Sequence, residues 1–157
     1  STLLYSPQAP VPKFRPDYSV VLSVNETIGT PFEDGFFTLS IRNNTTVDLE
    51  IRSIHFIDLN ELIVCKIRNE NNEDVTKERL QIYRKATVRG KHLATIPSGN
   101  TLTVPIESSV ANASALKPGT YKCNAIFEYR ELTLKSNELS IAITQKQINA
   151  HLRKSKE

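Results

Sequence analysis

The side chains that most often act as catalysts or metal ligands are few in this chain and widely spaced. The three histidines, His55, His92 and His151, are isolated, and none has the second histidine four residues away that a helical zinc site needs. There is no Gly-x-Ser-x-Gly turn, no glycine-rich phosphate loop and no pair of carboxylates in a recognisable catalytic frame. We therefore predict a non-enzymatic protein that uses no cofactor and no catalytic metal.

Oxygen ligands are concentrated in the segments 58–61 and 70–74, which are rich in Asp, Asn and Glu. Neither segment has the ligand spacing and central glycine of a calcium-binding loop. We interpret both segments as solvated turns.

The two cysteines, Cys65 and Cys123, are too few and too far apart for a metal knuckle or a Cys-x-x-Cys redox pair. Cys65 alternates with Ile63 and Ile67, and Cys123 follows Tyr121 by two residues, so both thiols are predicted to point into the core. Two inward thiols could form a disulfide between two sheets if their Cβ atoms lie close together. They could equally remain two buried thiols that pack as small apolar groups.

Positive charge is concentrated in two places, although the net charge is only +3, from 20 basic and 17 acidic residues. One is a candidate binding surface within 77–91, namely Tyr83, Arg84, Lys85, Arg89 and Lys91. The other is the segment 146–157. These segments could contact an acidic protein, an anionic glycan or a phospholipid surface, or they could be a solvated loop and tail. Few aromatic residues lie among them, so the stacking platform of a nucleic-acid site is missing and we predict no nucleic-acid partner.

Acceptor sequences for N-glycosylation, Asn-x-Ser/Thr, begin at Asn25, Asn43, Asn44 and Asn112. We take Asn25, Asn44 and Asn112 as candidate glycosylation sites. They would matter only in a eukaryotic secreted chain.

The clearest structural pattern follows the turn Pro118-Gly119. From Tyr121 to Tyr129 every second residue is apolar and all but one of the residues between are polar. This period of two predicts a half-buried strand at the centre of a sheet.

Similar patterns predict further strands, and turn residues separate them every 8 to 12 residues. A change of parity within 47–57 predicts a bulge or bend. Pro105 predicts that its strand lies at an edge or near a bulge. Segment 69–92 is predicted as an irregular excursion. We divide the chain into a proline-rich arm or linker (1–16), a β-sandwich domain (17–145) and a basic tail, either a frayed helix or disordered (146–157). The predicted strands span about 17–25, 36–42, 47–57, 61–68, 92–96, 102–106, 121–129 and 138–144.

The stretch 117–123 resembles the turn and Tyr-x-Cys of an immunoglobulin-type strand. That resemblance implies a tyrosine corner, in which the hydroxyl of Tyr121 bonds back to the turn. The chain departs from antibody domains because it has no Trp and because Cys65 follows about three predicted strands. The ordered turns at 43–45, 96–100, 117–121 and 136–139 are similar to those of bacterial immunoglobulin-like accessory domains. Proteinase-inhibitor and PapD-like chaperone domains have a similar order and spacing of strands and turns. The resemblance implies an all-β, antiparallel immunoglobulin-like sandwich of about seven to nine strands.

This fold without a recognisable site predicts a protein-binding or assembly module. We expect it to be exported, whether periplasmic, secreted or on the cell surface, and to belong to an envelope or cell-surface complex. Loops or an exposed sheet edge would make the contact, because unpaired backbone groups of an edge strand accept a partner strand. Two alternatives stay open: a protease inhibitor acting through loop 26–35 or 110–118, and a sandwich with a hidden ligand or hydrolytic site.

Overall fold

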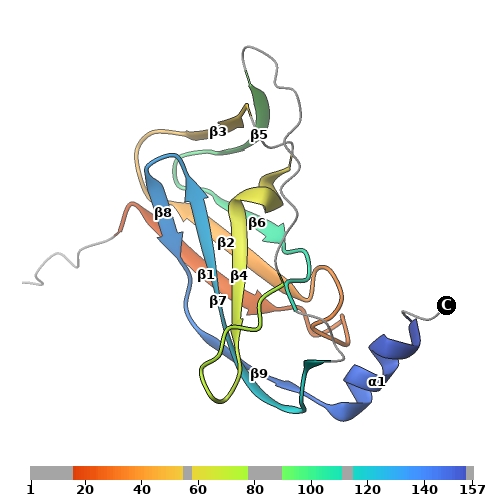
Figure 1. The fold of residues 1–157 in the computed structure, drawn as a ribbon. Helices are drawn as coiled ribbons and strands as arrows, with labels where there is room; N and C mark the ends of the chain where they lie inside the picture. The colour runs from red at the N-terminus through yellow and green to blue at the C-terminus, as the bar shows by residue number, and fades with distance from the viewer. Residues whose placement is uncertain (1–15, 55–57, 78–89, 111–114, 155–157) are drawn as a thin grey trace, which may run out of the picture.

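The structure is a computed structural model that describes residues 16–54, 58–77, 90–110 and 115–154. These residues form nine strands, one short 3-10 helix and one α-helix (Figure 1). Every pair of hydrogen-bonded neighbouring strands is antiparallel. The prediction of an all-β protein with antiparallel sheets is therefore confirmed.

One sheet has three strands in the order β1-β2-β6. Leu22, Leu39 and Val104 lie side by side across it and are buried, whereas the residues next to them in sequence face the other way. This alternation is what the sequence predicts for strands with one face on the core. Pro105 ends the outer strand, as predicted, because proline cannot donate to a central ladder. The strands are β1 (Tyr18–Val24), β2 (Phe37–Asn43) and β6 (Thr101–Pro105).

The second sheet is built around the long strand β7 (Gly119–Tyr129). The strand β4 (Ile63–Arg68) pairs with one side of β7, and β8 (Leu132–Lys135) and β9 (Leu139–Ile143) pair with the other. The odd-numbered side chains of β7, from Tyr121 to Tyr129, are all buried, as predicted. The strand β8 was not predicted from the sequence.

Strands β8 and β9 are two parts of one edge strand interrupted by a bulge. Phe127 lies opposite Leu134, whereas Cys123 lies opposite Leu139, so the outer strand has one extra residue between these pairs. At the bulge, the backbone N–H of Ser136 donates to the carbonyl oxygen of Ala125 at 2.9 Å. The backbone N–H of Ala125 donates to the hydroxyl of Ser136 at 2.8 Å.

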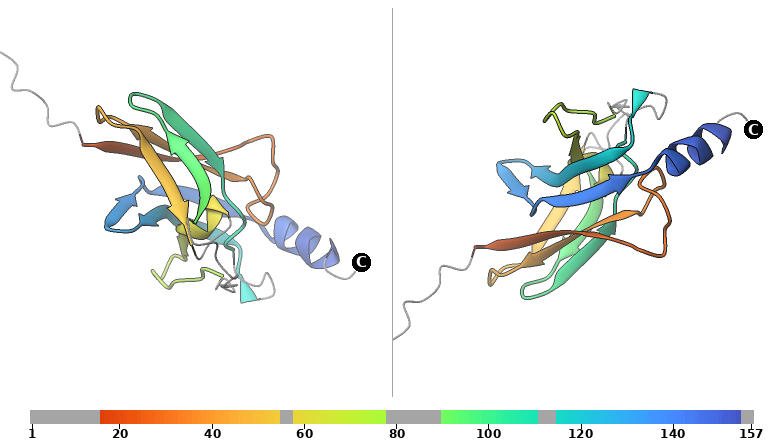
Figure 2. Two further views of the ribbon diagram at one scale, coloured as in Figure 1. Left: turned by 90° about the horizontal axis from the view of Figure 1, so that it is seen from above. Right: turned by 90° about the horizontal axis from the view of Figure 1, so that it is seen from below.

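The two sheets face each other as layers, and one apolar core lies between them (Figures 1 and 2). The bulge also connects the layers through a side chain. The amide oxygen of Asn137 accepts the backbone N–H of Leu22 at 2.8 Å, and its amide nitrogen donates to the carbonyl oxygen of Leu22 at 3.2 Å. The largest fully buried core side chains include Phe37, Ile41, Ile51, Ile63, Ile67, Ile96, Phe127 and Ile143.

A two-stranded ribbon, β3 (Leu49–Ser53) with β5 (Lys91–Ile96), extends from one end of the layers (Figure 1). The register shifts between Ile51 and Arg52, within the segment for which the sequence predicts an irregularity. Val47, which the alternation places inside, is instead exposed, because the chain enters the ribbon only at Leu49. The ribbon is tied to β7 by the hydroxyl of Tyr129, which accepts the backbone N–H of Arg52 at 3.1 Å.

The strand β9 leads directly into an α-helix, α1 (Gln145–Lys154), where the sequence predicts a frayed helix or a disordered tail. Thr144 and Gln147 form a reciprocal cap: the N–H of Thr144 donates to Gln147 Oε1 at 2.9 Å, and the N–H of Gln147 donates to Thr144 Oγ1 at 3.1 Å. Ile148 is buried, and the ring of His151 stacks on Phe32 with centroids 4.5 Å apart. The helix is therefore part of the folded body.

The 3-10 helix η1 (Leu59–Leu62) leads into β4, and the chain after β4 turns back along its edge. The N–H of Val75 donates to the carbonyl oxygen of Ile67 at 2.8 Å, and the N–H of Ile67 donates to Thr76 Oγ1 at 2.9 Å. The rest of the predicted excursion, 78–89, lies outside the described residues, as does most of the proline-rich arm. Within the described ranges, no helix is long and apolar enough to cross a membrane.

Candidate functional site

The histidines do not come together in the described part of the chain. His92 lies exposed on β5, with its ring nitrogen 2.7 Å from the hydroxyl of Thr95, and His151 stacks on Phe32. His55 lies outside the described residues. Across 16–54, 58–77, 90–110 and 115–154, no three His, Cys, Asp or Glu side chains form a group able to hold a metal ion.

The acidic segments act in local structure. Asp58 and Glu61 form a reciprocal cap on η1. The carboxylate of Asp74 accepts the backbone N–H of Thr76 at 2.8 Å, and hydrogen bonds from the side chain and the backbone of Thr76 lower the pKa of Asp74. Lys66, 3.5 Å away, lowers this pKa further. These contacts stabilise the turn after β4.

The two cysteines are separate buried thiols, so the alternative of a disulfide is wrong for this structure. They lie on paired strands of one sheet and not on facing sheets. Cys65 lies opposite Ala125 and Cys123 lies opposite Ile67, which makes the thiols diagonal neighbours. Diagonal positions are about 7 Å apart, whereas a disulfide needs Cβ atoms about 4 Å apart. Burial, and then the neighbouring Cys65, raise the pKa of the Cys123 thiol to about 12.

The candidate basic surface falls mostly outside the described residues. Tyr83, Arg84, Lys85 and Arg89 are not described, and Lys91 is exposed at the start of β5. Contact with an anionic surface or glycan through this segment stays a prediction.

The candidate glycosylation sites differ in their surroundings. Asn25 is partly buried and its amide oxygen accepts two bonds from Thr27. Asn44 is also partly buried, and its amide nitrogen, the atom that would be modified, donates to Ser19 Oγ at 2.8 Å. Asn112 lies outside the described residues. The fourth acceptor sequence begins at Asn43, which is fully buried.

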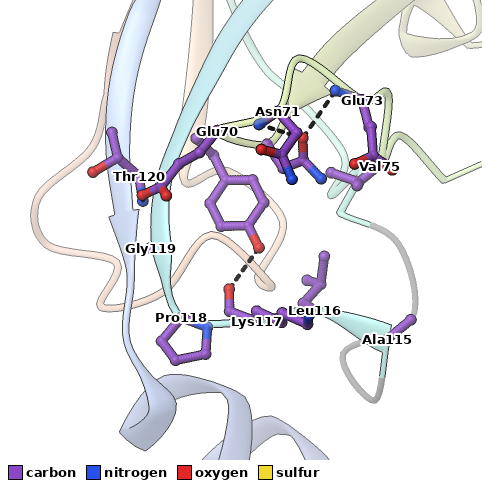
Figure 3. A pocket seen from close by; sticks show the side chains of 12 residues that line it. Glu70, Asn71, Glu73, Val75, Ala115, Leu116, Lys117, Pro118, Gly119 and Thr120 are labelled. Carbon is purple, nitrogen blue, oxygen red and sulfur yellow. Dashed lines mark hydrogen bonds between the residues drawn. The ribbon is translucent and has the colours of Figure 1, made fainter.

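At one end of the second sheet, a hollow of about 350 Å³ is lined by the turn before β7 and by the segment after β4 (Figure 3). Tyr121 lines it, and its hydroxyl donates to the carbonyl oxygen of Lys117 at 2.6 Å. Glu70 accepts the backbone N–H of Thr120 at 3.0 Å. These two hydrogen bonds hold the turn before β7 in place.

Loop 26–35, a candidate inhibitory loop, is packed onto the body. Phe32 is buried under α1, and the N–H of Gly35 donates to the carbonyl oxygen of Ile106 at 2.9 Å. The carboxylate of Asp34 accepts the N–H of Ser108 at 2.8 Å. The loop is thus anchored through Phe32, Asp34 and Gly35, while Glu26, Thr27 and Gly29 are exposed. The second candidate loop, 110–118, is only partly described.

The sheet edges offer unpaired backbone groups, and several of them are guarded. On β1, the amide of Asn137 occupies both the N–H and the carbonyl of Leu22. On β6, Pro105 lacks an N–H, and the amide of Asn60 bonds the carbonyl of Pro105 and the N–H of Glu107 at 3.0 and 3.1 Å. On β4, Val75 and Thr76 bond the backbone of Ile67, as described above. Such guards prevent association edge to edge.

Antiparallel pairing determines which backbone groups of β9 point away from β7. Both backbone groups of Ala125, its N–H and its carbonyl, bond to Ser136. The backbone N–H and carbonyl groups of the odd-numbered residues of β7 therefore point toward the outer strand. The backbone N–H and carbonyl groups of their partners Leu139 and Ile141 therefore point toward β7 and bond to it. The N–H and carbonyl groups of Ser140 and Ala142 point outward.

We call these outward groups of Ser140 and Ala142 the β9 edge. Within the described residues, neither residue has a hydrogen-bond partner on that side. Both side chains are small and exposed, and no proline, lysine or bulge lies within Leu139–Ile143. Asn137 before β9 bonds to Leu22 of β1, and Gln147 after β9 bonds to Gly29 of the β1–β2 loop. Between these two contacts, and unlike β1, β4 and β6, the β9 edge has no guard among the described residues.

No family model matches the sequence, and comparison with curated proteins gave no match. The site therefore rests on geometry alone.

The residues that distinguish the edges were not predicted from the sequence. Asn60 and Asn137 lie in turn-rich segments, where Asn is common for local reasons, so nothing in the sequence marks them as edge guards. For the helix α1, the sequence does contain a start signal, because Thr144 and Gln147 have the spacing of a capping box.

Proposed function

We propose that this protein is a non-enzymatic protein-binding or assembly module built on an immunoglobulin-like β-sandwich. The strand order supports the finer fold assignment. If β3 and β8 are left unlettered and β5 is taken as strand D, then β1, β2 and β6 correspond to A, B and E, and β4, β7 and β9 correspond to C, F and G. The ribbon β3-β5 is the main departure, because β5 pairs with β3 and not with β6.

The turn before β7 gives independent support for this assignment. In immunoglobulin-like domains a tyrosine near the start of strand F, two residues before a cysteine, bonds back to the preceding corner. Tyr121 has that position relative to Cys123, and its hydroxyl bonds to Lys117.

The observation that carries the functional proposal is the open β9 edge. Each unpaired N–H and carbonyl can bond to an extended segment of another protein, which would then continue the sheet. Because β1, β4 and β6 are guarded, the partner adds along β9. The main chain supplies affinity, and side chains at alternate positions supply specificity.

We also propose that the module is exported and acts in an envelope or cell-surface complex. The turn motifs that resemble bacterial accessory domains support this proposal.

The experiment uses affinity capture with three baits: the wild-type protein, Ala142→Pro and Thr103→Pro. Proline at 142 removes an outward N–H that takes no part in the fold, so the sheet should keep its internal bonds. Thr103→Pro makes the same change at the guarded strand β6. Ala142→Val, which retains the N–H, is the second control. We expect one partner to bind the wild-type protein and both controls and to be lost from Ala142→Pro.

A partner held equally by all variants would contradict binding at β9, and the lack of any specific partner would contradict the binding-module proposal. Capture of a protease together with its inhibition would favour the inhibitor alternative.

A further inference from the structure

A hollow of about 440 Å³ lies between α1 and the loop that joins β1 to β2. This volume is within the range of pockets that hold a small ligand or a bulky side chain. Most of its wall is apolar. A Cβ atom added to Gly29 would meet no other heavy atom within 4 Å, so the hollow has room beside the loop. The residues that line the hollow include Gly29, Glu33, Thr144, Lys146 and Lys154.

The net positive charge of the residues that line this hollow favours binding of a negatively charged group. Lys146 and Lys154 contribute two positive charges, and Glu33 contributes one negative charge. Lys154 already pairs with Glu33 at 3.2 Å. Lys146 is exposed and takes part in no ion pair within the described residues, so it is the cation available to a ligand.

The hollow begins next to the C-terminal end of β9. Thr144 follows the last residue of β9 and also lines the hollow. On the other side, the amide of Gln147 donates to the carbonyl oxygen of Gly29 at 3.3 Å, which joins helix and loop. Figures 1 and 2 show α1 continuing from the end of β9. A strand added along β9 would therefore end at the hollow.

We propose that this hollow anchors the partner segment by receiving an apolar side chain that is followed by an acidic residue paired with Lys146. The inference rests on the proposed strand addition at β9. The occupant is an extended protein segment that pairs parallel to β9, so that its C-terminal end reaches the hollow, with apolar residues at alternate positions and one acidic residue after the last of them. The apolar side chain gains from leaving water, and the ion pair selects the neighbouring residue.

The test is selection from a random twelve-residue peptide library displayed on phage. Four baits are used: wild type, Lys146→Glu, Lys135→Glu and Ala142→Pro. Lys135 is an exposed lysine on β8, away from the hollow, and provides the matched charge control. Wild type and Lys135→Glu should select alternating apolar residues followed by Asp or Glu. Lys146→Glu should keep the alternation and lose the acidic preference, and Ala142→Pro should select no common pattern.

These outcomes separate the two proposals. Alternation that depends on Ala142, without an acidic preference that depends on Lys146, would overturn the anchor and leave strand addition standing. Selection unaffected by Ala142→Pro, or no selection on wild type, would overturn strand addition and the anchor with it.

A titration of one selected peptide, followed by fluorescence polarisation, gives the size of the effect. Loss of one partly exposed ion pair in Lys146→Glu should raise Kd about fivefold. Gly29→Leu, which adds a bulky side chain at a residue that lines the hollow, should raise Kd about tenfold or more, whereas Gly29→Ala should change it little. Equal Kd values for Gly29→Leu and Gly29→Ala would show that the hollow holds no part of the peptide.

Discussion

At the residue scale, Asn43 is the buried polar group on which the turn after β2 depends. Its amide nitrogen donates to the carbonyl oxygens of Val47 at 2.8 Å and Ile96 at 2.9 Å. Its amide oxygen accepts the N–H and the hydroxyl of Thr45 at 2.9 and 2.7 Å. All four hydrogen-bonding positions of the amide are thus occupied.

Replacing Asn43 with Ala should lower the free energy of unfolding by about 3 kcal/mol, because four hydrogen bonds of one buried amide are lost together. Urea denaturation measures the change. Asn100→Ala, at an exposed turn position, is the control and should cost about 0.5 kcal/mol or less. Equal losses for the two variants would show that the Asn43 bonds contribute nothing particular.

Cys123 should make stability fall in alkaline solution. Its pKa is raised from 9.0 to about 12 in the folded protein, mainly by burial. The stability associated with the neutral thiol is therefore fully present below about pH 9 and is lost as the pH rises toward 12. The loss approaches about 1.4 kcal/mol per pH unit. Unfolding free energies from pH 7 to 11 should decline more steeply for the wild type than for Cys123→Ala, and parallel curves would contradict the raised pKa.

Inward side chains were the residues best predicted from the sequence. Cys65, Cys123 and Tyr121 are all buried, because a period of two determines which face a residue occupies once a strand is given. Whether two inward cysteines meet depends on the register of paired strands, which one strand's pattern does not contain. The diagonal placement of the thiols therefore could not be predicted.

At the element scale, the bulge between β8 and β9 turns the side chain of Asn137 toward β1. Asn137→Ala should lower the free energy of unfolding by about 1 kcal/mol, since water can replace part of an exposed interaction. The backbone N–H of Leu22 should also exchange faster with solvent. Native-state hydrogen exchange by NMR measures this, with Asn149→Ala on α1 as the control. An unchanged exchange rate at Leu22 would show that Asn137 does not guard β1.

Strand existence was largely predictable and strand pairing was not. Alternation located β1, β2, β4, β6, β7 and β9 to within a few residues, because burial on one face imposes it. It missed β8, whose four residues Leu132–Lys135 follow β7 after the two-residue turn at Arg130. The segment that we predicted as a frayed helix or a disordered tail forms α1. Ile148 is buried and His151 stacks on Phe32 of the β1–β2 loop, and a local sequence pattern does not reveal such tertiary contacts.

At the scale of the whole molecule, two sheets share one core while their edges differ. The edges of the β1-β2-β6 sheet are interrupted by two side-chain amides and a proline, and β4 is covered by the chain that follows it. Only pairing across the whole sheet reveals that β9 lacks such a guard among the described residues. This asymmetry is the basis of the proposed binding function.

The most direct test is hydrogen exchange of the β9 amides in the monomeric wild-type protein, measured by NMR at low concentration. Leu139 and Ile141 pair with β7, so their N–H groups should exchange slowly. The N–H groups of Ser140 and Ala142 point outward and should exchange rapidly. Alternating slow and fast exchange along β9 is the result we predict. Slow exchange at Ser140 and Ala142 in the monomer would show that the edge is already covered and would contradict strand addition at β9.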